Sequence, residues 1–361
     1  MKRLEILISV VCCLIGTGAL SSCSMIDEDR SDCAPAPEPE KESEVNYELR
    51  LVTNMTTELD TKLSMQTEIG LHHALKKHLE GIFTDFAHDV DLSFYDNKGD
   101  SIRLQHDQHI MDASQASYTL YLPKREYMHL AAANLLNDDQ VQLTDDEHCH
   151  PSKLRQLAAD TIKSHTTGLF TARLPMNVLE GIDQDFYVRL YMANCAAVLV
   201  VDSRGHAIEG MEVFSTGFGT GFSICDSAFI YSERPPIVRT NLVQDEEGGS
   251  EIGFCCVNFP SREPSTTRTV IETTEPFVAP SDEESLWEFQ VYVPQPETAS
   301  TRGFRRFTRT VLHVRRPLRA GQLMIIKGWM DDDGGIRTAS QYVGVDVTLD
   351  WSPGWHFDPE F

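Results

Sequence analysis

The cysteine at position 23 has the most specific chemical setting of any reactive side chain in this sequence. Two basic residues near the start precede an apolar run over residues 6–20, and a Ser-Ser pair then leads directly to Cys23. A basic start, an apolar run too short for a comfortable membrane span and small residues before a cleavage point predict a secretory signal peptide over residues 1–22. Cleavage there would leave a thiol on the first residue of the mature chain.

The segment Leu20-Ser21-Ser22-Cys23 resembles the lipobox of bacterial lipoproteins. This resemblance implies that the Cys23 thiol takes a diacylglycerol, that the chain is cut before it, and that the new amino terminus is acylated. Two or three acyl chains give stable anchoring, whereas one is marginal. The alternative is an ordinary signal peptide whose cut falls close to a cysteine by chance.

Residues 23–44 are expected to be a flexible tether, because they are acidic at first and then charged and rich in proline. Such a composition cannot bury enough apolar surface to fold, and alternating prolines keep a chain extended. The acidic cluster after Cys23 also resembles the surface-export signal of Bacteroidetes lipoproteins. A solvated spacer without any signal is the alternative.

Other candidate reactive clusters lack the partners that their chemistry requires. His148-Cys149-His150 could present two imidazoles to a metal, but no further ligand follows at a suitable spacing. The glycines in 217–221 do not follow the phosphate-loop spacing and predict a hairpin, and Asp331–Gly335 lacks the ligand ladder of an EF-hand and predicts a turn. The sequence contains no nucleophile elbow and no HExxH motif. We therefore expect no catalytic residues, no bound metal, no cofactor and no enzymatic activity.

Composition restricts the class of partner. The 361 residues carry a formal net charge of −24, which argues against nucleic acid as a partner because phosphate binding needs a basic surface. Once the signal and Cys23 are set aside, six cysteines remain, in an untidy distribution that predicts no disulfide framework. Cys255 and Cys256 are adjacent in an apolar strand-like run, so we expect them to face opposite sides, with one of them buried.

Alternating apolar and polar residues predict mainly strands, beginning with Tyr47–Thr53. Leu59–Phe86 has helical periodicity, residues 153–162 include a short helical piece, and Phe186–Asp202 is the richest β segment. Many short strands separated by turns indicate sandwiches. The predicted fold is therefore all-β with minor helix, in two tandem Ig-like β-sandwich domains over 45–194 and 195–361.

Three segments together resemble the FimB/Mfa2 family of fimbrial anchor lipoproteins of Bacteroidetes. They are the region from Cys23 to Cys33, the mid-chain Val188–Asn194 and the closing Gly344–Trp351. The resemblance implies two transthyretin-like β-sandwich domains, a lipid anchor in the outer membrane and exposure at the cell surface. It also implies a role in holding a fimbrial polymer and influencing its length.

Such a protein would bind fimbrial shaft subunits by β-strand addition. We expect the joint to border either the first strand, Tyr47–Thr53, or the last, Val343–Trp351. A fimbrial tip adhesin is an alternative, as is a surface glycan-binding lipoprotein that uses Trp329, Trp351 and Trp355 as a flat platform. A lipid-anchored hydrolase is disfavoured, because no convergent set of acid, base and nucleophile is evident.

Overall fold

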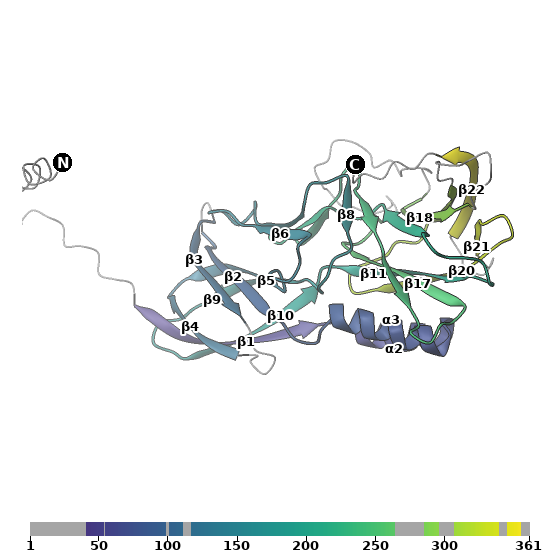
Figure 1. The fold of residues 1–361 in the computed structure, drawn as a ribbon. Coiled ribbons are helices and arrows are strands. Elements are labelled where there is room, and N and C mark those ends of the chain that lie inside the picture. Colours follow the sequence, from purple (N-terminus) through teal and green to yellow (C-terminus); the bar gives the residue numbers. More distant parts are fainter. Residues whose placement is uncertain are drawn as a thin grey trace, which may run out of the picture. The chain divides into compact units, whose positions relative to one another are not determined.

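The computed structural model describes residues 41–53, 55–98, 101–110, 117–263, 285–295, 307–338 and 345–354. These residues form many strands and two helices, which confirms the predicted all-β class with minor helix (Figure 1). Neither described helix has the length and apolar character needed to cross a bilayer. The predicted signal peptide, Cys23 and the tether up to residue 40 lie outside the described residues.

The first sheet has seven strands and supplies the first half of the β structure. Its order is β3 (Arg103–Ile110), β2 (Asp89–Asp96), β5 (Glu126–Ala133), β9 (Phe170–Asn177), β10 (Gln184–Met192), β1 (Glu42–Val52) and β4 (Ser117–Pro123). Strand β1 begins at Glu42, so the last three residues of the predicted tether, 42–44, belong to this sheet.

This sheet folds back on itself between β9 and β10, which share only two residue pairs. The buried side chains of both halves belong to one apolar cluster, as expected of a sandwich. Tyr47 of β1 and His129 of β5 meet inside it. His129 Nδ1 donates to the Ser93 carbonyl at 3.0 Å, so its Nε2 accepts the Tyr47 hydroxyl proton. Burial lowers the pKa of His129 to about 4, and the imidazole is therefore neutral.

Strand β1, one of the two strands expected to border the joint, lies inside the sheet. The strand pairs in parallel with β10 over Val45–Val52 and antiparallel with β4 over Glu42–Glu48. Its alternating pattern of buried and exposed residues predicts a half-buried strand but contains no information about how many neighbours the strand has. Over Val45–Glu48 the strand therefore has a neighbour on both sides, and beyond Glu48 only β10 pairs with it among the described residues. That the first strand borders the joint stays a prediction.

Two helices replace the single helix expected over Leu59–Phe86. They are α2 (Met55–Gln66) and α3 (Ile69–Ile82), and the extended backbone of Glu68 separates them. Thr53 Oγ1 accepts the Met55 N–H at 3.0 Å at the start of α2. The buried face of α3 consists of Leu71, Leu75, Leu79 and Ile82, at the helical spacing that the sequence shows.

The second sandwich packs a five-stranded sheet on a six-stranded sheet. The five-stranded order is β16 (Asn241–Gln244), β17 (Glu251–Asn258), β11 (Cys195–Asp202), β20 (Leu323–Met330) and β21 (Ile336–Thr338). The six-stranded order is β22 (Val345–Gly354), β19 (Phe307–Val314), β18 (Trp287–Pro294), β12 (Glu212–Thr216), β15 (Ile237–Arg239) and β8 (Thr161–Lys163).

The five-stranded sheet is covered on both faces. Helices α2 and α3 contact β20, β16 and β17 on one face, and the six-stranded sheet packs on the other (Figure 1). Double coverage explains why β17 is buried along its whole length instead of alternating. Cys255 belongs to the cluster under the helices and Cys256 to the cluster between the sheets. Their opposite facing is confirmed, but both are buried, so the expectation of one buried cysteine is wrong.

The fourth sheet combines strands from both halves of the chain. Its order is β14 (Ala228–Ile230), β13 (Gly221–Ser223), β7 (Lys153–Gln156) and β6 (Val141–Thr144). It covers the outer face of β2 and β5 through a third apolar cluster. Residues 153–162 contain β7 and the start of β8, so the expected helical piece is wrong. This sheet thus contains strands from both sides of the predicted domain boundary between residues 194 and 195. The boundary itself stays a prediction.

The glycine-rich segment 217–221 is a crossover and not the expected hairpin. It leads from β12 in the six-stranded sheet to β13 in the fourth sheet. Gly217 has a φ of 101°, and a Cβ atom on it would lie 2.6 Å from Trp287 Cα. A Cβ on Gly221 would lie 2.6 Å from the Leu154 carbonyl oxygen. The glycines permit close backbone packing where the chain changes sheets.

Candidate strand-addition edge and basic pocket

Strand β22 is the edge strand of the six-stranded sheet in the part of the chain that the structure describes. It pairs antiparallel with β19, from Val314 opposite Val345 to Phe307 opposite Gly354, with an irregularity near Arg309. No strand among the described residues pairs with its other side. At ten residues it is the longest edge strand of the described sheets. A strand at the edge of a sheet has backbone N–H and C=O groups on its outer side to which another strand can pair.

The register places each residue of β22 opposite a residue of β19. Val347 lies opposite the buried Leu312, and Asp346 and Asp350 lie opposite His313 and Arg309. In the sequence, the apolar residues of β22 alternate with Asp, Thr and Ser. Pro353 is compatible with this position, because a proline in a sheet is tolerated at an edge where no hydrogen bond is lost.

The neighbouring core fixes β19 on its inner side. His313 Nδ1 lies 3.3 Å from Glu288 Oε2 on β18, and the two side chains are 6% and 0% exposed. Glu288 Oε1 also accepts a hydrogen bond from Gln290 Nε2 at 2.6 Å. A carboxylate buried this deeply needs such partners to offset its desolvation. Strand β19, which pairs with the edge strand, is thus held in place by its contacts with β18.

The edge strands of the seven-stranded sheet, β3 and β4, are shorter than β22, and β3 is partly covered. At β3, the Arg103 N–H donates to the Glu147 carbonyl at 2.6 Å, so a neighbouring segment covers part of that edge. Arg103 also pairs with Asp145, and His106 Nε2 lies 2.9 Å from Asp91 Oδ2. Strand β4 has seven residues, against ten in β22. Charge and cover are common protections against unwanted pairing, and the greater length of β22 makes it the better candidate for strand addition.

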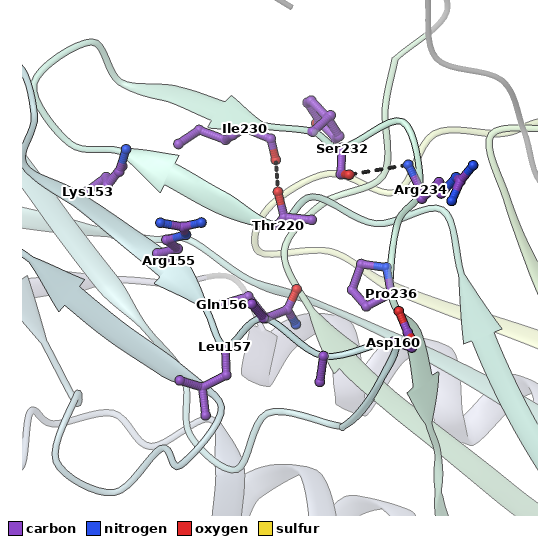
Figure 2. Close-up of a pocket in the computed structure, with 13 residues that line it drawn as sticks. Lys153, Arg155, Gln156, Leu157, Asp160, Thr220, Ile230, Ser232, Arg234 and Pro236 are labelled. Atoms are coloured by element: carbon purple, nitrogen blue, oxygen red, sulfur yellow. Dashed lines mark hydrogen bonds between the residues drawn. The ribbon is translucent and has the colours of Figure 1, made fainter. Parts of the chain in front are cut away.

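A basic pocket of about 770 Å³ is formed by β7, the β13–β14 pair and the loops that follow β7 and β14. Lys153 and Arg155 lie on one side and Arg234 on the other, while Asp160 is the acidic residue in its lining (Figure 2). None of these three cations forms an ion pair with a described residue. Unpaired cations gathered in a pocket are notable in a chain whose net charge is −24.

A buried acceptor without a donor belongs to another residue of the pocket lining. Gln156 lines the pocket, is 5% exposed and has an Oε1 atom with no hydrogen-bond partner among the described residues. Its Nε2 is 3.3 Å from both His165 Nε2 and Asn258 Oδ1. A buried polar atom without a partner is costly and is relieved by a water or a ligand group. The pocket therefore combines positive charge with an unsatisfied acceptor.

The candidate residues from the sequence lie in separate parts of the structure. Asp331–Gly335 forms the predicted turn between β20 and β21, where Asp331 Oδ1 accepts the Gly335 N–H at 2.8 Å. Cys149 of the His148-Cys149-His150 cluster is buried beside Cys225. Arg204 covers the ring of Trp329, with its Cζ 4.6 Å from the ring centroid. One face of the Trp329 ring is therefore occupied by Arg204.

Sequence reasoning missed the pocket and the partner of Cys149. The pocket brings together residues near 155 and 234, and Cys225 is 76 positions from Cys149. The sequence signal available was weak, since Lys153 and Arg155 alternate on one strand face as any solvated pair does. Cys23, Trp355 and the side chain of Trp351 lie outside the described part of the chain.

Comparison with known proteins gives structural likeness only. No known protein family's sequence profile matches the chain, and no curated protein matches it. A putative adhesin from Bacteroides ovatus is 9% identical with a TM-score of 0.49, covering 87% of this chain and 95% of its own. Putative polysaccharide binding proteins from Bacteroides thetaiotaomicron are 9% identical with a TM-score of 0.45, covering 88% and 99%.

The fimbrial anchor protein Mfa2 from Porphyromonas gingivalis is 11% identical with a TM-score of 0.42, covering 85% of this chain and 98% of its own. These identities and TM-scores are too low to carry information about function. Solved structures similar to this chain thus include a member of the FimB/Mfa2 family that its sequence resembles.

Proposed function

We propose that this protein is an outer-membrane lipoprotein, exposed at the cell surface, that anchors a fimbrial polymer and influences its length. The single structural observation that supports this role is the open edge of β22. A shaft subunit would add a strand there, with main-chain hydrogen bonds giving affinity and alternate side-chain positions giving specificity. The partner is therefore a fimbrillin that presents an extended segment.

The membrane attachment in this proposal rests on the sequence. Cys23 follows a predicted signal peptide, and the acidic, proline-rich stretch after it separates the lipid from β1. We also propose a non-catalytic role. Two titratable clusters that the structure does assemble, Glu288 with His313 and Tyr47 with His129, are buried in the sandwich cores, out of reach of a substrate.

Site-specific photo-crosslinking tests the edge directly. A photoreactive phenylalanine replaces Thr348 on β22, and the matched control places it at the exposed Thr119 on the edge strand β4. Cells that make the fimbria are irradiated, and adducts with shaft subunits are detected by mass spectrometry. We expect adducts from position 348 and none from position 119. Equal yields, or adducts from β4 alone, would contradict a joint at β22.

Labelling with a palmitate analogue tests the anchor. We expect the wild type to incorporate the label and Cys23→Ala to lose both label and membrane fraction, while protease shaving of intact cells reports surface exposure. Recovery of an unlabelled, freely secreted wild type would remove the proposal. Immunogold labelling then separates two roles: gold at the fimbrial base supports an anchor, and gold at the far end supports a tip adhesin.

The basic pocket favours a second candidate function, the binding of an acidic saccharide. An acid group on the ligand would pair with Lys153 and Arg155 or with Arg234, and a sugar hydroxyl could donate to Gln156 Oε1. Pockets of ~300–1,000 Å³ hold small ligands, and the volume of about 770 Å³ lies in this range. Neutral sugars would lack the charge interaction, and sulfate would lack the hydroxyl donor.

Calorimetric titration of the purified protein with polygalacturonate oligomers tests this second function. We expect binding that weakens with added salt and falls at least tenfold in K153A/R155A, a loss of ~1.4 kcal/mol or more. Arg189→Ala, on an exposed position of β10 outside the pocket, is the matched control. Equal affinity for neutral dextran oligomers, or an equal loss in Arg189→Ala, would refute the acidic-saccharide site.

A further inference from the structure

Cys149 and Cys225 bring two sulfur atoms into contact across the two halves of the chain. Their Sγ atoms are 2.7 Å apart, and the residues are 1% and 4% exposed. The backbone around them is held on both sides: the Cys149 N–H donates to the Ser101 carbonyl at 3.2 Å, and the Ile224 N–H donates to the Ser152 carbonyl at 3.2 Å. Pairing of β7 with β13 aligns the two segments.

The three other described cysteines have no such neighbour. Cys195 has its Sγ 3.5 Å from the Asn258 carbonyl, and Cys255 and Cys256 lie in different apolar clusters. Among the described residues, the pair of Cys149 and Cys225 is therefore distinguished by the meeting of its two sulfurs. A specific pair of this kind in an exported protein is suited to covalent cross-linking.

A metal site is the other chemistry that these residues suggest. His150 Nδ1 lies 3.7 Å from Cys225 Sγ and 3.4 Å from Asp226 Oδ1, and His150, Cys225 and Asp226 could share an ion. That set includes Cys225 but not Cys149, so it does not account for the contact between the two sulfurs. A site that used both thiolates would hold them roughly 3.8 Å apart on one tetrahedral Zn²⁺ with bonds of ~2.3 Å. The separation of 2.7 Å is too short for that arrangement and favours a bond between the sulfurs.

We propose that Cys149 and Cys225 form a disulfide when the chain folds under oxidising conditions. One cysteine thiolate attacks a disulfide of an oxidant, either a thiol-disulfide oxidoreductase or glutathione disulfide, and releases one oxidant thiolate. The second cysteine thiolate then attacks the mixed disulfide and releases the other. The electron pair and the two protons of the protein thiols thus pass to the oxidant. The reaction precedes burial, because burial raises the pKa of the Cys149 thiol and hides it from the oxidant.

The bond would act as a mechanical lock in a load-bearing anchor, a consequence that rests on the proposed function. Tension between the lipid near residue 23 and a fimbria at β22 would pass along the chain through the region between the two cysteines. The disulfide bypasses that region, whose ends are 76 positions apart. It also joins the β6–β7 side of the fourth sheet to its β13–β14 side, which come from different halves of the chain.

Peptide mapping tests the bond itself on the full protein refolded with glutathione disulfide. We expect a non-reduced peptide that joins Cys149 to Cys225, and a protein mass lower by two hydrogen atoms. We also expect reductant to lower the wild-type Tm by roughly 5–10 °C and to leave C149A/C225A unchanged. Cys255→Ala is the matched control and should keep both the linkage and the response to reductant.

Single-molecule pulling between handles at the two termini measures the length of chain that the disulfide holds back from extension. Reductant should release about 250 Å of additional chain from the wild type and none from C149A/C225A. Two free thiols after oxidative refolding, or Zn²⁺ held by the pair, would overturn the proposal. A cross-linked pair after refolding together with free thiols in protein taken from cells would support the bond and count instead against export of the chain.

Discussion

Replacing His129 with glutamine should make the stability of the protein less sensitive to acid. The imidazole lies at the centre of the first sandwich, fully buried, stacked on Phe94 with ring centroids 4.3 Å apart and bonded to Tyr47 and Ser93. A glutamine amide can likewise donate to the Ser93 carbonyl and accept from the Tyr47 hydroxyl. His129→Gln therefore keeps the polar contacts and removes the titrating group.

The magnitude follows from the pKa of His129, which burial lowers from 6.5 to about 4. The unfolded chain takes up a proton below pH 6.5, whereas the folded chain does so only near pH 4, so acid favours unfolding. The contribution is complete above pH 6.5 and is lost as the pH falls towards 4. The full difference is ~3.4 kcal/mol, of which ~2 kcal/mol is lost between pH 7.5 and pH 5.

Urea denaturation at pH 7.5 and pH 5 measures this difference. Between these two conditions we expect the wild type to lose ~2 kcal/mol more unfolding free energy than His129→Gln loses. His73→Gln, at an exposed position of α3, should lose as much as the wild type. Equal losses in His129→Gln and the wild type would show that His129 is not held in the neutral form by burial.

Three further substitutions test the packing around the five-stranded sheet. A Cβ on Gly253 would lie 2.9 Å from Leu75 Cδ2, so Gly253→Ala should lower the free energy of unfolding by ~1–3 kcal/mol, measured by thermal unfolding. The double change Gly253→Ala with Leu75→Ala should lower it by less than the sum of the two single changes. Glu251→Ala would remove the buried partner of Lys327 and should cost ~3 kcal/mol in both low and high salt, whereas a cost that disappears in high salt would indicate that the pair is exposed to solvent. Asp331→Ala should cost ~1 kcal/mol through the turn between β20 and β21, measured by the same unfolding assay, and should leave crosslinking from β22 unchanged.

The sequence predicted an element correctly where one buried face determines its pattern of apolar residues. The alternation in β1 and the spacing of Leu71, Leu75 and Leu79 in α3 follow from which face meets a core, and the structure confirms both. The continuous apolar run of β17 could not be assigned in the same way, because burial on one face or on both depends on the layers above and below it. The helices that cover β17 come from residues 55–82, far from it in the sequence.

The candidate sites, like the burial of β17, depend on contacts between distant segments of the chain. The edge position of β22 and the interior position of β1 are both matters of sheet order, and sheet order depends on pairings between distant strands. A strand pattern alone gave no preference between these two strands. The pocket and the pair Cys149 and Cys225 likewise depend on β7 lying beside β13.

The sequence by itself determined the β-rich class, the acidic character and the predicted lipid attachment at Cys23, because composition and short motifs are local properties of the chain. Tertiary structure alone decided which strand has an open edge, which cations share a pocket and which cysteines meet. These features arise when segments many tens of residues apart are brought together to bury apolar surface, and no local pattern encodes that choice of partners.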